Sequence, residues 1–105
     1  MNNTACELIV AIVNHGFEDD VMTAARSAGA RGGTVFNARG TANADDEVKF
    51  LGITLHPNNE IIFILTEQKT KIEIMQAIKK AAGLATPGAG ILFTLPVESF
   101  LGVEF

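Results

Sequence analysis

The chain has 105 residues, 48% of them hydrophobic, and a formal net charge of −4 at pH 7. This length fits one domain with its own core, and the apolar fraction excludes an intrinsically disordered chain. No apolar run reaches the roughly 20 residues of a membrane-spanning helix, and an acidic chain without a basic cluster argues against nucleic acid as the main partner.

The first residues and the single cysteine bear on the compartment. Residues 1–7 lack the basic region of a signal peptide, so we expect a cytoplasmic location. Cys6 stands alone, which excludes an intrachain disulfide and a cysteine-based zinc site. We expect Cys6 to be a small buried residue at the start of the first strand.

The first half of the chain has the pattern of a strand, a helix and a second strand. Leu8 to Val13 is an unbroken apolar run, which is typical of a buried strand. Three acidic residues, 18–20, stand where a helix N-terminus favours negative charge, and Gly29 supplies the stop. The stretch from Gly33 to Arg39 is strand-like.

A long connection follows, from Thr41 to Pro57. It opens with a polar stretch that includes Asp45-Asp46-Glu47 and continues with scattered apolar residues. A connection of this length inside a compact domain is usually functional or mobile. The acidic run either recognises a basic partner or a cation, or is simply solvated.

The second half repeats the pattern. Glu60 to Thr66 predicts a buried strand, and Thr70 to Glu73 has the sequence of a capping box that opens a helix. Gly83 ends this helix, and Gly90 to Pro96 predicts the last strand.

The order strand-helix-strand, loop, strand-helix-strand predicts an α+β fold, the ferredoxin-like βαββαβ sandwich, with both helices on one face of the sheet. We expect one domain over residues 1–105. Apolar residues nevertheless occupy both faces of the strands, as Leu8 to Val13 shows. A monomer would expose one of these faces, so we expect a homo-oligomer that packs sheet against sheet.

Two glycine-rich turns, within Gly29 to Thr41 and Gly83 to Val97, each lead into a strand and suggest paired binding loops. Four segments match a known family pattern: Phe17 to Val21, Gly29 to Gly40, Glu60 to Thr66 and Gly88 to Phe93. Through these segments the chain resembles the P-II family of nitrogen-regulatory signalling proteins, in particular its short, divergent members. The resemblance implies a homotrimer with inward-facing sheets. It also implies clefts between subunits that bind adenine nucleotides (ATP, ADP or AMP) or another small anion.

The resemblance further implies that Thr41 to Pro57 is a T-loop, which docks onto a membrane transporter or a metabolic enzyme. The loop residues that we expect to contact the partner are Thr41, Asn43, Asp45, Asp46, Glu47, Lys49 and Phe50. The residues matched to effector binding are Ile12, Gly32, Gly33, Thr34, Gly40 and Ile64, with Gly88, Ala89 and Gly90 in a phosphate-binding turn and Arg39 at the loop base. The turn either cradles an anion with its backbone amides or only makes a tight connection, and Arg39 contacts either the ligand or another subunit.

The chain departs from the family pattern in its charges. Ile91 stands where the phosphate turn usually carries a lysine, and Gly102 and Glu104 stand where arginines are expected. Each lost charge-assisted contact removes about 1.5–3 kcal/mol from phosphate binding. The chain has no tyrosine, which excludes uridylylation of the loop.

Two other classes of protein share this architecture. A metal-binding trimer that resembles the divalent-cation tolerance family would use His15, His56 and the acidic loop. A small ferredoxin-like enzyme would need a catalytic set, and the chain offers neither a Ser-His-Asp arrangement nor a Cys-His pair. We therefore expect a non-catalytic regulator without a required cofactor.

Overall fold

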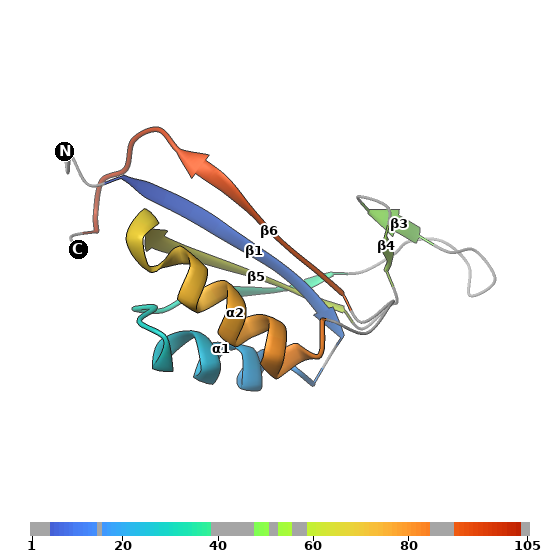
Figure 1. The fold of residues 1–105 in the computed structure, drawn as a ribbon. Coiled ribbons are helices and arrows are strands. Elements are labelled where there is room, and N and C mark those ends of the chain that lie inside the picture. Colours follow the sequence, from blue (N-terminus) through green and yellow to red (C-terminus); the bar gives the residue numbers. More distant parts are fainter. Residues whose placement is uncertain are drawn as a thin grey trace.

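A computed structural model describes residues 5–14, 16–38, 48–50, 53–55, 59–84 and 90–103. Four strands form an antiparallel sheet in the order β2-β5-β1-β6, and the helices α1 and α2 cover one of its faces (Figure 1). The predicted α+β, ferredoxin-like arrangement is confirmed. The elements are β1 (Cys6–Asn14), α1 (Glu18–Ser27), β2 (Thr34–Ala38), β3 (Val48–Phe50), β4 (Ile53–Leu55), β5 (Asn59–Glu67), the 3-10 turn η1 (Gln68–Thr70), α2 (Lys71–Ala82) and β6 (Gly90–Val97).

The sequence pattern did not predict β3 and β4. They pair with each other as a separate two-stranded sheet, with Val48 opposite Leu55 and Phe50 opposite Ile53. Figure 1 shows this hairpin, in green, beyond one end of the main sheet and away from the helices. The connection from Thr41 to Pro57 therefore contains regular structure of its own.

The core lies between the sheet and the helices. Successive residues of a strand point to opposite faces, and Ile9, Ala11 and Val13 of β1 face the helices. Their register partners in β5 include Ile62 and Ile64, which are fully buried on the same side. Burying each large aliphatic side chain stabilises the fold by about 1.5–3 kcal/mol. The helices contribute Val21, Met22, Ala25, Ile74, Ile78 and Ala82 to this core.

The helix ends follow the sequence signals at their C-termini. Gly29 comes just after α1 with a φ of 117°, and Gly83 caps α2 with a φ of 65°. The predicted capping box is wrong, because the Thr70 side chain makes no cap hydrogen bond. The Thr70 hydroxyl instead lies 2.7 Å from the Thr66 hydroxyl and donates to the Glu67 carbonyl at 3.1 Å. The preceding 3-10 turn places this hydroxyl toward the strand rather than toward the first turn of the helix.

The second face of the sheet carries no helix, and we call it the open face. Exposed apolar residues lie on it, among them Leu95, which is 49% exposed, and Phe36, which is 43% exposed. The rings of Phe36 and Phe63 meet edge to face, 4.9 Å apart. Both faces of the strands are thus apolar, as expected. By register, the open face consists of Leu8, Val10, Ile12, Thr34, Phe36, Ile61, Phe63, Leu65, Ile91, Phe93 and Leu95.

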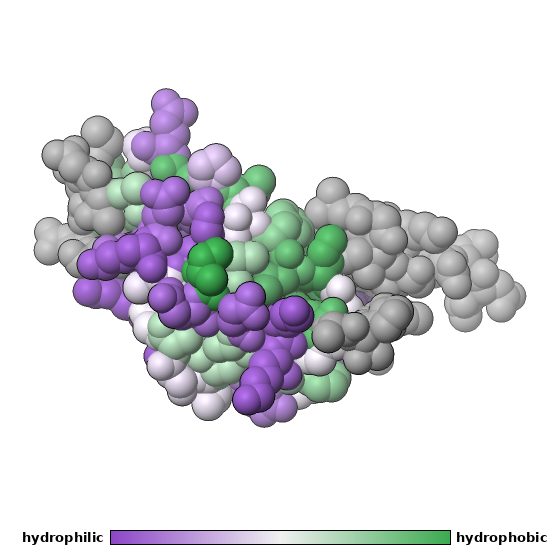
Figure 2. Space-filling view, viewed as in Figure 1, coloured by the Kyte–Doolittle hydropathy of each residue, from purple (hydrophilic) through white to green (hydrophobic). Residues whose placement is uncertain are grey.

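The helix side has a different surface. Figure 2, seen from the same direction as Figure 1, shows hydrophilic residues spread over much of the side that carries the helices. Of the two faces, the open one is therefore the candidate for a permanent interface, since large exposed apolar patches mark interaction surfaces.

An ion pair ties the start of β1 to the start of α2. Lys71 Nζ lies 2.8 Å from Glu7 Oε2, and the two side chains are only 21% and 10% exposed. We expect Lys71→Met to lower the free energy of unfolding by about 2 kcal/mol, because it leaves the Glu7 carboxylate poorly solvated and unpaired. Urea unfolding measures this loss.

Lys69→Met is the matched control. The Lys69 ammonium pairs with Glu67 at 3.3 Å, but the Lys69 side chain is 76% exposed. The same change should therefore lower the free energy of unfolding by less than about 1 kcal/mol. Equal losses in both variants would show that the burial of the Glu7 pair does not matter.

Candidate functional site

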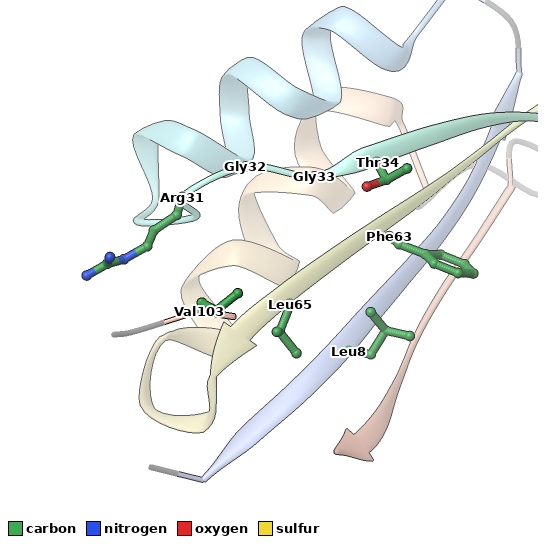
Figure 3. A pocket seen from close by; sticks show the side chains of 8 residues that line it. All are labelled: Leu8, Arg31, Gly32, Gly33, Thr34, Phe63, Leu65 and Val103. Carbon is green, nitrogen blue, oxygen red and sulfur yellow. The ribbon is translucent and has the colours of Figure 1, made fainter. Parts of the chain in front are cut away.

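A cleft of about 410 Å³ lies where β2 begins, at one end of the open face. Gly32, Gly33 and Thr34 form one side of it, in the segment that joins α1 to β2 (Figure 3). Strands β1 and β5 supply its apolar floor. The lining residues are Leu8, Arg31, Gly32, Gly33, Thr34, Phe63, Leu65 and Val103.

Close packing explains the glycine at position 33. A Cβ on Gly33 would lie 2.9 Å from the Phe63 carbonyl oxygen and 3.0 Å from Met22 Sδ, tighter than ordinary contacts. The backbone of Gly33 therefore runs against β5 and α1 with no room for a side chain. At Gly32 nothing lies within 4 Å of such an atom, so this residue leaves open space in the cleft.

The polar groups of the cleft come from one short segment. Thr34 opens β2 opposite Phe63 and brings a hydroxyl, which can both donate and accept a hydrogen bond. Arg31 brings a guanidinium at the other end of the segment, where Figure 3 shows it directed away from the strands. The arrangement offers a flat apolar surface with a few polar groups along one edge, the usual composition of a small-molecule site.

The C-terminal segment closes one side of the cleft. After β6 the chain turns back, and Gly102 adopts a φ of 92°, a left-handed conformation that favours glycine. This turn brings Val103 against the cleft (Figure 3). The neighbouring Leu101 is 82% exposed and does not line the cleft.

The predicted effector residues separate into two groups. The cleft brings together Gly32, Gly33 and Thr34, as the resemblance implies. Ile64 lies on the opposite face of the sheet, fully buried in the helix-side core, and its neighbours Phe63 and Leu65 line the cleft in its place. Ile12 is fully buried between its register partners, further along β1 than the cleft.

Gly90 has a structural reason to be glycine. It opens β6 opposite Val13 with a φ of 149°, and an added Cβ would overlap the Ile12 carbonyl oxygen. Packing alone therefore explains why position 90 is a glycine, which agrees with the interpretation of Gly88-Ala89-Gly90 as a tight connection. Substituting Gly90 would disturb the β1–β6 pairing whether or not the turn binds an anion.

Other predicted residues lie outside the described part of the chain. Lys49 and Phe50 belong to β3, whose backbone is described. The predicted residues outside the described ranges are Arg39, Gly40, Thr41, Asn43, Asp45, Asp46, Glu47, Gly88 and Ala89, with both histidines.

Sequence reasoning missed four apolar lining residues: Leu8, Phe63, Leu65 and Val103. The register between β1 and β5 places the first three on one face of the sheet, and this register cannot be read from the sequence. Val103 lies near the end of the chain and reaches the cleft only through the turn at Gly102.

Cys6 is buried at the start of β1, as expected. Burial raises the pKa of its thiol above the ordinary value, and the nearby Glu67 carboxylate adds to the shift. The thiol therefore stays protonated near neutral pH and is a poor nucleophile. Within the described ranges, no three His, Cys, Asp or Glu side chains gather as metal ligands, and no helix is long and apolar enough to span a membrane.

Comparisons with known proteins agree with the fold. The family model described as Nitrogen regulatory protein P-II matches residues 6–103. Among solved structures, Arabidopsis thaliana PII bound to citrate is similar in fold, with a TM-score of 0.67 and 22% sequence identity over 90% of this chain and 78% of that chain. A comparison with curated proteins found no match.

Proposed function

The chain belongs to the P-II family, a family of regulatory signalling proteins, and we propose on that premise that it is a non-catalytic sensor of a small effector. The effector would bind in the cleft beside Gly32, Gly33 and Thr34 and bias the segment from Thr41 to Pro57 between conformations. Such a bias requires that the effector bind one conformation more tightly than the other. The cleft at the start of β2 is the observation that carries this proposal.

The candidate effector is an adenine nucleotide or another small anion. The apolar floor of Leu8, Phe63 and Leu65 suits a flat ring, and the Thr34 hydroxyl suits a ring nitrogen or an amino group. The citrate bound to the Arabidopsis relative is a small anion, which is consistent with an anionic effector here.

The open face supports a homotrimer. A monomer would leave the exposed apolar residues of the open face, such as Phe36, Phe63 and Leu95, in water, and a cyclic trimer would cover the three faces by packing them together. The cleft lies at an end of this face, so assembly would bring a second subunit beside it.

The segment from Thr41 to Pro57 would contact the regulated protein, a membrane transporter or a metabolic enzyme, in nitrogen metabolism. The β3–β4 hairpin supports this part of the proposal, because it lies beyond the main sheet. An isolated two-stranded hairpin is marginally stable in water, so contact with a partner would stabilise it.

A thermal-shift panel with ATP, ADP, AMP and citrate tests the effector site. A ligand at about 100 times its dissociation constant adds roughly 2.7 kcal/mol of stability. We expect one nucleotide to raise the melting temperature and Thr34→Val to weaken its binding up to about tenfold, the value of one hydrogen bond.

Thr23→Val is the matched control, because Thr23 is exposed on α1, away from the cleft. It should leave the ligand affinity unchanged. If no nucleotide or carboxylate shifts the melting temperature, or if both valine variants bind alike, the proposed site is not an effector site.

A further inference from the structure

We propose that the outer edge of β6, together with the groove between β6 and α2, binds an extended segment of a partner protein as an added strand. The segment that fits carries a large apolar residue and, at its C-terminal end, a carboxylate. This surface is separate from the cleft at the start of β2 and from the segment Thr41 to Pro57, so the proposal goes beyond the proposed function and does not depend on it.

The first observation is the edge itself. In the strand order β2-β5-β1-β6, β6 is an outer strand, and among the described strands it pairs with β1 alone (Figure 1). Its residues, Gly90–Val97, include no charged side chain. Proteins usually protect an edge strand with charged residues, and an apolar edge without them is a template for another strand.

The second observation is the direction of the backbone groups. An added Cβ at Gly90 would overlap the Ile12 carbonyl oxygen, so this carbonyl of β1 points toward β6. Along an antiparallel strand, successive residues turn their N–H and C=O groups to opposite sides. By the register of β1 with β6, Leu92 and Thr94 therefore turn these groups to the outer edge. Pro96 has the same parity, and a proline is tolerated there because it has no N–H to lose from the pairing with β1.

The third observation is the groove beside this edge. A pocket of about 330 Å³ lies between α2 and the start of β6, and its apolar lining includes the half-buried Met75, Leu84 and Leu92. Figure 2 shows hydrophobic residues gathered between these two elements. Side chains that lie opposite each other on paired strands point to the same face of the sheet. Because Leu92 faces the helices, an apolar residue opposite it on an added strand would enter this pocket.

The fourth observation is the charge at the rim. Lys79 lines the pocket from the last turn of α2, and its side chain is exposed. Lys69 and Lys71 are held in ion pairs, whereas no carboxylate of the described residues pairs with Lys79. In an antiparallel pairing, the C-terminal end of the added strand lies beside the start of β6, where a carboxylate would complement Lys79. A second copy of β6 has no carboxylate, which favours a partner protein over another copy of this chain.

NMR titration of the isotope-labelled full chain with the peptide TVTLTD, blocked at both ends, tests the proposal. The leucine of this peptide is placed opposite Leu92 and its aspartate beside Lys79. We expect saturable shifts of the amide signals of Leu92 and Thr94 and slower hydrogen exchange at both, because their N–H groups gain a partner. The peptide TVTLTK should bind at least about fivefold more weakly, because its lysine meets Lys79.

Lys79→Glu should reverse this preference, so that TVTLTK binds more tightly than TVTLTD. Lys80→Glu is the matched control, since it makes the same change on the next residue, which does not line the pocket, and it should leave the preference within about twofold. Thr94→Pro removes an N–H from the outer edge, where Pro96 already lacks one. This variant should keep its circular dichroism spectrum and lose the binding.

The absence of saturable shifts with either peptide would overturn the proposal. Shifts confined to β2 would also overturn it, because the peptide would then have added to the opposite edge of the sheet. Equal effects of the two glutamate variants would remove Lys79 from the site. A fall in the assembly mass by light scattering as the peptide binds would show that a second copy of this chain covers the edge instead.

Discussion

Leu95→Asp should convert the assembled protein into monomers. Leu95 lies on the open face opposite Leu8, is 49% exposed in the single chain, and would be covered in the proposed trimer. A carboxylate there would lose its hydration on assembly without gaining a partner, and in a symmetric trimer the change is made three times. Light scattering should give three times the 11.1 kDa chain mass for the unmodified protein and one chain mass for the variant.

Ile72→Asp provides the control. Ile72 is 58% exposed on α2, on the other side of the sheet, so an aspartate there should leave the assembly intact. An unmodified chain that scatters as a monomer, or a Leu95→Asp variant that remains assembled, would show that the open face serves another purpose.

Gly90→Ala should destabilise the fold by about 3 kcal/mol. A φ of 149° lies in a region that is essentially restricted to glycine and costs a residue with a Cβ about 1–3 kcal/mol, and overlap with the Ile12 carbonyl adds an overpacking cost of about 1–3 kcal/mol. The strain falls on the pairing of β1 with β6, where Gly90 lies opposite Val13. Urea unfolding followed by circular dichroism measures the loss.

Gly32→Ala is the comparison for this change. Gly32 has no atom within 4 Å of an added Cβ and no left-handed φ, so alanine there should change stability by less than about 0.5 kcal/mol. Equal stabilities for the two alanine variants would contradict the packing explanation of Gly90.

The sequence predicted the four strands of the main sheet and the two helices because their signals are local. An unbroken apolar run marks β1, acidic residues mark the start of α1, and Gly83 marks the end of α2. The hairpin was missed because β3 and β4 have only three residues each, too few for the alternation of apolar and polar residues to stand out.

The local sequence does not show which side chains of β5 face the helices. From Ile61 to Leu65 every residue is apolar, so no alternation indicates which side chains face the helices. The pairing of Ile9 with Ile64 decides it, and a shift of one residue exchanges the two faces. The resemblance suggested Ile64 for the cleft, whereas the register puts Phe63 and Leu65 there.

The cleft itself depends on contacts between distant segments. Leu8, Thr34, Leu65 and Val103 come from four parts of the chain and meet only after the sheet has formed. The glycine-rich turn before β2 could be recognised from its sequence. The apolar side chains that surround it could not, because each looks like an ordinary core residue.

The strand order also governs how the chain can fold. β1 lies at the centre of the sheet, and its partners, β5 and β6, begin at Asn59 and Gly90. Both contacts are distant in sequence, and such contacts form slowly because long loops must close first. During synthesis, β1 therefore leaves the ribosome well before either partner strand, and one of its two edges stays unpaired until β6 has been made.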